Sequence, residues 1–158
     1  MDIQSRREWF GRVAWLGALS ALLPSSASSQ TTPSRRYVKT PGTQARAYSP
    51  AVITQGGTTI WLAGQTASMD ESGRVLDFEG QVRQLFSQFA KTLQEAGGRL
   101  SDIVTMTVFI TDIRNAEQFL RIRRETFGDN FPASALIEIT GLVPPLALIE
   151  IQAVAVVG

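Results

Sequence analysis

Apolar and polar positions divide the body of this 158-residue chain into short strands and two longer helices. Runs rich in β-branched and aromatic residues, bounded by turn-forming residues, predict strands. Apolar residues that recur every three or four positions predict amphipathic helices. The predicted strands are 51–55, 58–66, 103–111, 135–140 and 146–156, the predicted helices are 78–96 and 115–127, and 41–47 is predicted to be a loop. The order strand, strand, helix, strand, helix, strand, strand predicts one α+β domain, with both helices on one face of a mixed sheet.

Glycine and proline predict how the strands connect. Gly56 and Gly57 predict a hairpin between the first two strands. The segment Gly-Leu-Val-Pro-Pro at 141–145 predicts a wide turn, so the last two strands are expected to form a long antiparallel hairpin. Gly64 lies inside a strand of good β formers, which predicts a bulge or a close approach by a ligand or another backbone.

Apolar residues occupy both faces of the predicted strands, so the face without helices also needs a cover. The residues predicted on that face are Trp61, Met106, Phe109 and Leu148. A closed homo-oligomer commonly buries such a face.

The second helix should direct Phe119, Ile122 and Phe127 toward the core. The solvent-exposed side of this helix is predicted to carry its three arginines, Arg121, Arg123 and Arg124.

Two glutamates lie in repeated Ile-Glu-Ile triplets within apolar strands, Glu138 and Glu150. A carboxylate there must reach solvent or be held in a pocket with a partner. Alternation predicts that Glu138 faces solvent, because its isoleucine neighbours share the opposite face. The strand around Glu150 is apolar at nearly every position, so both of its faces should be covered and Glu150 becomes a candidate site residue.

The first 27 residues predict a signal peptide of the twin-arginine type. Arg6 and Arg7 precede an apolar run at 13–23, and small residues follow it. That run is too short to cross a bilayer as a stable helix, so no permanent membrane anchor is expected. An amphipathic surface helix is the alternative to a signal peptide, and the general secretory route is the alternative to the twin-arginine route. The predicted organisation is a signal peptide at 1–27, a disordered linker at 28–36 and one domain at 37–158. The protein should be exported to the periplasm, after transient contact with the export machinery.

Composition narrows the available chemistry. The chain contains no cysteine and no histidine, which excludes Ser-His-Asp and Cys-His catalysis and nearly every zinc site. The formal net charge is +1, and the part of the chain that follows the predicted signal peptide, residues 28–158, is neutral. Nucleic-acid binding normally requires a clustered basic excess, so no nucleic-acid partner is expected.

Five segments in register resemble the RidA/YjgF/YER057c/UK114 (RutC-like) family. They are Tyr-Ser-Pro-Ala-Val at 48–52, Leu-Ala-Gly-Gln-Thr at 62–66, Val-Phe-Ile-Thr-Asp at 108–112, Phe-Pro-Ala at 131–133 and Ile-Glu-Ile-Gln-Ala at 149–153. The resemblance covers nearly all of 37–157. It implies a chorismate mutase-like fold, a homotrimer and a small-molecule site in each cleft between subunits. The active members hydrolyse reactive 2-iminoacids and enamines to 2-oxoacids and ammonia without a cofactor.

The resemblance also implies roles for particular residues. Tyr48 matches the aromatic residue near the cleft, Gly64 the glycine whose backbone contacts the ligand, and Glu150 the acid that positions the attacking water. Ser134 and Leu136 match two further positions of the cleft.

Ser134 marks this chain as a divergent member, because the family's deaminases carry an arginine at that position. That arginine binds the substrate carboxylate through a two-pronged contact, and losing such a partner typically costs about 2–5 kcal/mol in binding. The mid-helix asparagine of many members is replaced by Leu120. The ligand is therefore either neutral or a carboxylate held by another arginine, such as Arg123 or Arg124.

The leading hypothesis is a trimeric hydrolase, similar to the 2-iminoacid deaminases, in which Glu150 acts as the general base of an intersubunit cleft. The alternative is a non-catalytic, small-ligand-binding or chaperone-like protein of the same fold, which Ser134 motivates. Ribonuclease action has been attached to this family, but the absence of a basic excess in residues 28–158 and the absence of histidine argue against it here.

Overall fold

The structure is a computed structural model that describes residues 32–158. The predicted signal peptide at 1–27 lies outside the described residues. No helix within residues 32–158 is long and apolar enough to cross a membrane.

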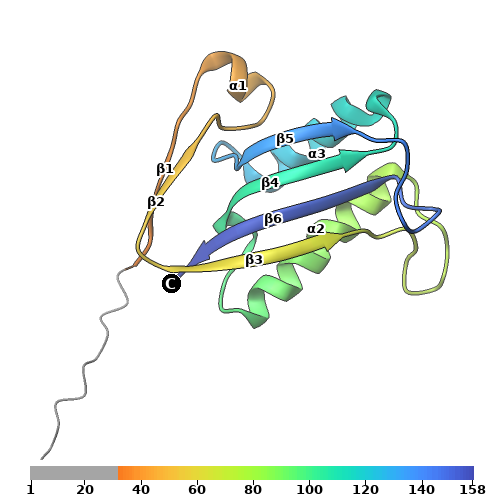
Figure 1. Ribbon diagram of the computed structural model, residues 1–158, viewed down its shortest axis with the longest axis horizontal. Coiled ribbons are helices and arrows are strands. Elements are labelled where there is room, and N and C mark those ends of the chain that lie inside the picture. Colours follow the sequence, from red (N-terminus) through yellow and green to blue (C-terminus); the bar gives the residue numbers. More distant parts are fainter. Residues whose placement is uncertain (1–31) are drawn as a thin grey trace, which may run out of the picture.

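A mixed four-stranded sheet forms the centre of the molecule, with its strands in the order β3-β6-β4-β5. The strands are β3 (Thr58–Gln65), β4 (Ile103–Ile110), β5 (Ala133–Glu138) and β6 (Ile149–Val157). β6 pairs antiparallel with β3 and β4, while β4 and β5 are parallel. Helices α2 (Phe78–Glu95) and α3 (Ala116–Phe127) both lie against one face of this sheet (Figure 1). The α+β domain with two helices on one face is therefore confirmed.

The amphipathic pattern explains why α2 forms and which side it buries. Asp77 caps its N-terminus by accepting a hydrogen bond from the Gly80 backbone N–H at 2.8 Å. Gly97 follows the last residues of α2 and has a φ of 78°, the left-handed conformation that commonly ends a helix. The buried residues recur every three or four positions and are Phe78, Gln81, Val82, Leu85, Phe86, Phe89 and Leu93. Burial of each large apolar side chain contributes about 1.5–3 kcal/mol, so α2 supplies much of the core.

The terminal strands do not form the predicted hairpin. β4 lies between β5 and β6 and pairs with both of them. The reason is the α3 crossover: a helix between two strands returns the chain in the same direction, which places β5 parallel to β4. The segment after β5 then crosses to the other side of β4, where β6 pairs antiparallel to it.

A separate two-stranded ribbon precedes the sheet, made of β1 (Ser34–Tyr37) and β2 (Val52–Gln55) with α1 (Pro41–Ala45) between them. The predicted hairpin between β2 and β3 is wrong, because β2 pairs with β1 and the chain turns at Gly56 and Gly57 into the main sheet. The predicted linker at 28–36 is also wrong in its last residues, since β1 starts at Ser34 and gains backbone hydrogen bonds from β2.

The remainder of the predicted loop is ordered as well. Thr40 caps α1 through a reciprocal pair of hydrogen bonds with Thr43, and Pro41 begins the helix. The short helix therefore replaces the loop predicted at 41–47.

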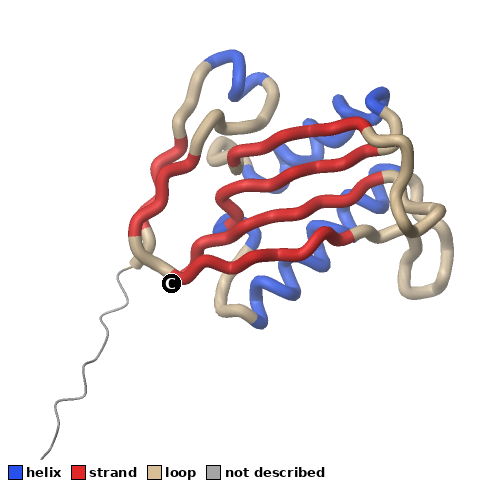
Figure 2. The backbone as a smooth tube through the Cα atoms, viewed as in Figure 1, coloured by secondary structure: helices blue, strands red, loops and turns tan. Residues whose placement is uncertain are grey.

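The face of the sheet opposite the helices is open in the single chain (Figure 2). Trp61 lies on this face with 79% of its surface exposed, beside Val154 of β6. Phe109 also lies there, in register with Glu150. The prediction was wrong for Met106, which is 1% exposed in the helix-covered core, and Leu148 also packs against that core.

Candidate functional site

Gly64 and Glu150 meet where β3 and β6 pair. The register of the two strands shifts between Leu62 and Gln65, so a β-bulge surrounds Gly64. The Glu150 carboxylate lies directly over this glycine: a Cβ placed on Gly64 would be 3.1 Å from Glu150 Cδ, and the Oε1 atom would be closer still. Glu150 is half-buried. The bulge predicted at Gly64 is therefore confirmed. The group that approaches the glycine is neither a ligand nor another backbone but the side chain of Glu150, the candidate general base.

A cavity of about 310 Å³ lies between α3, the segment before β2 and strand β5. Tyr48 and Leu136, two of the predicted site residues, line it together with Leu120. The complete lining is Arg46, Tyr48, Ile113, Ala116, Glu117, Leu120, Arg123 and Leu136. Its size is at the lower end for a small-molecule pocket, and its mixture of apolar walls with a few charged groups is typical of one.

The segment that carries Tyr48 is held against the start of β5. The Ser49 N–H donates to the Pro132 carbonyl at 3.1 Å, and Ser49 forms an isolated parallel bridge with Ala133. Ala47 is fully buried and has a φ of 53°, a left-handed conformation that is unfavourable for a residue with a Cβ. Such a conformation persists only where the surroundings enforce it. It turns the chain so that Arg46 and Tyr48 both reach the cavity wall.

Ser134 lies beside this cavity and is bound by an arginine. Arg123 of α3 donates a hydrogen bond from Nη1 to Ser134 Oγ at 2.7 Å. Its Nη2 donates to the Arg46 carbonyl at 2.9 Å. The prediction that Arg123 is solvated is therefore wrong: it is only 2% exposed, whereas Arg121 and Arg124 are exposed as predicted.

The Arg123 guanidinium has no carboxylate partner among residues 32–158. Its Nε is buried and makes no hydrogen bond in this part of the chain. The guanidinium carbon lies 5.1 Å from the centre of the Phe119 ring, a favourable cation–π geometry. Burial, and to a smaller degree the charges of Arg124 and Arg46, lower the pKa of Arg123 from 12.5 to about 10. The group therefore stays charged at neutral pH.

The predicted site residues fall into two groups on opposite faces of the sheet. Leu136 is in register with Val108, which is fully buried on the helix-covered side. Glu150 is in register with Phe109, the next residue of β4, whose side chain points to the open face. Gly64 and Glu150 consequently do not line the cavity that Tyr48 and Leu136 line. Within one chain, the residues predicted for a single cleft are not together.

Glu138, the other glutamate of the repeated triplet, has a structural role. Its side chain is exposed, as alternation predicted, and its Oε1 accepts a hydrogen bond from the Ile113 N–H at 2.8 Å. That contact fixes the short 3-10 turn Ile113–Asn115 before α3.

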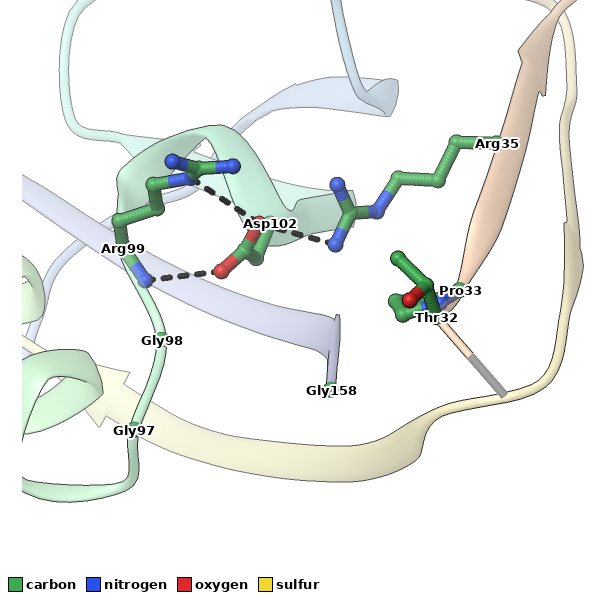
Figure 3. A pocket seen from close by; sticks show the side chains of 8 residues that line it. All are labelled: Thr32, Pro33, Arg35, Gly97, Gly98, Arg99, Asp102 and Gly158. Atoms are coloured by element: carbon green, nitrogen blue, oxygen red, sulfur yellow. Dashed lines mark hydrogen bonds and ion pairs between the residues drawn. The ribbon is translucent and has the colours of Figure 1, made fainter. Parts of the chain in front are cut away.

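Another cavity, near the C-terminal residue Gly158, has its charges paired within the protein. Arg35 of β1 donates to Asp102 Oδ1 at 2.8 Å, and the Arg99 backbone N–H donates to Oδ2 at 2.9 Å (Figure 3). Arg35 also donates to the Val156 carbonyl. Because both oxygens of Asp102 are occupied, this cluster ties the N-terminal ribbon to the sheet, and its one carboxylate is already paired.

Comparisons with known proteins agree with this architecture. The family model for Endoribonuclease L-PSP matches residues 39–157. A RutC family protein of Pyrococcus abyssi is 32% identical over 110 residues, which are 68% of this chain and 84% of that protein. The Rid family protein YyfB from Yersinia pestis superposes with a TM-score of 0.67 at 25% identity, covering 78% of this chain and 98% of that one. Rv2704 from Mycobacterium tuberculosis, a YjgF/YER057c/UK114 family member, gives 0.57 at 31% identity, covering 78% and 100%. This chain belongs to the RidA/YjgF/YER057c/UK114 (RutC-like) family.

Proposed function

We propose that this protein is a small-molecule hydrolase that converts imine or enamine intermediates to carbonyl compounds, in a cleft formed between copies of the chain in a homotrimer. The observation that carries the proposal is the Glu150 carboxylate, which lies over Gly64 on an open sheet face. A half-buried acid with a glycine beneath it leaves room for a small electrophile and a water molecule next to the carboxylate.

The reaction requires one general base and no cofactor. Glu150 takes a proton from water while the water oxygen attacks the imine carbon, which gives a tetrahedral carbinolamine. The protonated Glu150 returns this proton to nitrogen, which completes the neutral carbinolamine. Glu150 then takes the proton of the new hydroxyl group and passes it to nitrogen while the C=O bond forms and the C–N bond breaks, so the products are a carbonyl compound and ammonia. Backbone amides near Gly64 polarise the substrate, and Tyr48 closes the wall of the pocket.

The separation of the two residue groups supports a cleft between subunits. One copy carries Glu150 and Gly64 on its open face, and the cavity lined by Tyr48 and Leu136 lies on the other side of the sheet. A neighbouring copy that covers the open face would bring its own cavity residues toward Glu150. This arrangement also buries Trp61, which is 79% exposed in the single chain.

The test measures ammonia release from freshly generated 2-iminobutanoate and 2-iminopropanoate by the full-length protein. The Glu150→Gln variant keeps the side-chain size and should lose turnover by about 10²–10⁴-fold, the usual contribution of a general base. The matched control is Glu138→Gln, which changes the glutamate of the other Ile-Glu-Ile triplet and should leave turnover unchanged.

Equal turnover by Glu150→Gln and the parent protein would exclude Glu150 as the base. Absence of ammonia release by the parent protein would favour the alternative, a non-catalytic binding or chaperone-like protein. A parallel assay with single-stranded RNA tests the activity that gives the matched family model its description, and RNA cleavage that survives Glu150→Gln would require a different site.

A further inference from the structure

Arg123 is a buried cation whose charge is not balanced by any residue in 32–158. Buried charges are normally paired, because removing an ion from water is unfavourable without a partner. Arg123 instead contacts two neutral acceptors, Ser134 Oγ and the Arg46 carbonyl, and its Nε has no acceptor in the described part of the chain. Part of its hydrogen-bonding capacity is therefore unused, and within residues 32–158 its charge is offset by the Phe119 ring at 5.1 Å rather than by a carboxylate.

This cation lines the cavity that holds the predicted site residues Tyr48 and Leu136. Arg46 also lines the cavity, and Glu117 is the one carboxylate among its lining residues. The remaining walls are mostly apolar. A cavity with one buried guanidinium and apolar walls suits a small ligand that has a carboxylate at one end and a short hydrocarbon portion at the other.

We propose that Arg123 is the anion-binding residue of this cavity and that Ser134 positions its guanidinium. Position 134 of strand β5 carries no arginine, and helix α3 supplies a guanidinium that reaches the Ser134 hydroxyl. Ser134 makes this possible, because its small hydroxyl accepts the Nη1–H at 2.7 Å and leaves space for the incoming guanidinium. The 2-imino or 2-oxo carboxylate as ligand rests on the proposed function, whereas the assignment of the anion site rests on the geometry of Arg123.

The neighbouring arginines are less suited to this role. Arg124 is exposed and donates to the Ala45 carbonyl at 2.7 Å. Arg46 is exposed at the rim of the cavity. Water and salt screen exposed charges strongly, whereas a buried guanidinium keeps most of its attraction for an anion.

The experiment measures binding of 2-oxobutanoate and of uncharged 2-butanone to the full-length protein by isothermal titration calorimetry. The parent protein should prefer 2-oxobutanoate. Arg123→Gln should weaken 2-oxobutanoate binding by roughly 30-fold or more, the size expected when a buried charged partner is lost. Binding of 2-butanone should not change. Arg124→Gln is the matched control and should change the 2-oxobutanoate affinity by less than about 3-fold, since an exposed ion contact contributes little.

Two further variants separate binding from folding. Ser134→Ala removes the positioning hydrogen bond and should weaken 2-oxobutanoate binding by about 3–10-fold, in line with the usual net contribution of one hydrogen bond. Arg123→Lys retains a charge and should recover part of the affinity that Arg123→Gln loses. Circular dichroism establishes that each variant is folded at the temperature of the titration.

The proposal is wrong if folded Arg123→Gln binds 2-oxobutanoate as tightly as the parent, or if the parent does not bind it. A purely structural arginine would give the first result together with a lower thermal midpoint. This binding test does not depend on turnover. If binding depends on Arg123 but no ammonia is released, only the proposed hydrolase function is wrong, and the anion site stands. Ammonia release with unchanged affinity in Arg123→Gln overturns only the anion site.

Discussion

The most specific contact at the residue scale is the one between Gly64 and Glu150. Residue 64 must be a glycine for the carboxylate to occupy its position, since any Cβ would overlap Glu150 Oε1. The overlap involves the end of a flexible side chain, so the carboxylate can move away without disturbing the backbone. The glycine therefore determines where Glu150 points more than how stable the strand is.

Gly64→Ala should lower kcat by about 100-fold, because a displacement of about 1 Å of a reacting group can have that effect. The free energy of unfolding should change by less than about 1 kcal/mol, since exposed substitutions without core disruption are usually mild. Steady-state ammonia release and urea unfolding measure the two quantities. Gly141→Ala is the control, because a Cβ at Gly141 would meet no atom within 4 Å. Normal kcat in Gly64→Ala would show that this contact does not orient the base.

The burial of Arg123 could have been predicted from its spacing. It follows Phe119 by four residues and precedes Phe127 by four, so the same helical period that directs both phenylalanines inward also directs Arg123 inward. The usual preference of arginine for solvent led to the opposite prediction. What the sequence alone does not reveal is that Ser134, a neutral acceptor on strand β5, lies within hydrogen-bonding distance of Arg123 and makes its burial tolerable.

At the element scale, the helices and strands from β2 onward were predicted to within a few residues, whereas β1, α1 and the pairing of the strands were not. Period and composition identify α2, α3, β3 and β4 because each element shows its own repeat. Pairing depends on which strands meet across the sheet, and that information is absent from any single segment. The β5–β6 hairpin failed for this reason: a turn between two strands does not prevent a third strand, β4, from lying between them.

The two helices are joined on their outer side by a cluster of ion pairs. Glu79 of α2 accepts hydrogen bonds from Arg83 at 2.8 Å and from Arg121 of α3 at 2.6 Å. Glu125 of α3 accepts from Arg83 at 2.7 Å and from Arg121 at 2.8 Å. These contacts hold α2 and α3 together above the aromatic contact between Phe86 and Phe127, whose ring centres are 5.7 Å apart.

This cluster should make the stability of the protein sensitive to acid. Hydrogen bonds from Arg83, and then from Gln118 and Arg121, lower the pKa of Glu79 from 4.5 to about 2. Since the pKa is lower in the folded than in the unfolded state, the stabilisation is complete above pH about 4.5 and is lost as the pH falls to about 2. Urea unfolding across this range should show a smaller loss of stability for Glu79→Gln than for the parent protein.

The control for the acid experiment is Glu71→Gln, an exposed loop position with no ion pair among the described residues. Its unfolding curve should follow that of the parent protein at every pH. Parallel loss of stability in Glu79→Gln and the parent would mean that solvent screening already removes the contribution of this exposed cluster.

At the scale of the whole molecule, the open sheet face is the feature that a single chain leaves incomplete. Trp61 projects from it with 79% of its surface exposed, and Ile137 of the edge strand is 42% exposed. Exposed apolar surface of this kind is typical of an interface. The two groups of site residues lie on opposite sides of the same sheet. A neighbouring subunit that covers the open face would therefore also bring the two groups together and complete the proposed cleft.

Trp61→Lys should therefore affect assembly and catalysis together. A lysine at the centre of an apolar interface would bury an unpaired charge, which the isolated chain tolerates because the position is exposed there. We expect the parent protein to elute as a trimer in size-exclusion chromatography with light scattering, and Trp61→Lys to shift toward the monomer with a parallel loss of ammonia release. Val143→Lys, at a loop residue that is 97% exposed, is the matched control and should remain a trimer with normal turnover.

If Trp61→Lys is a folded monomer that retains full turnover, then Glu150 works within one chain and the cleft between subunits is not needed. If the parent protein itself is a monomer, then something other than a second copy of this chain covers the open face. In that case Arg123 binds 2-oxobutanoate within a single chain.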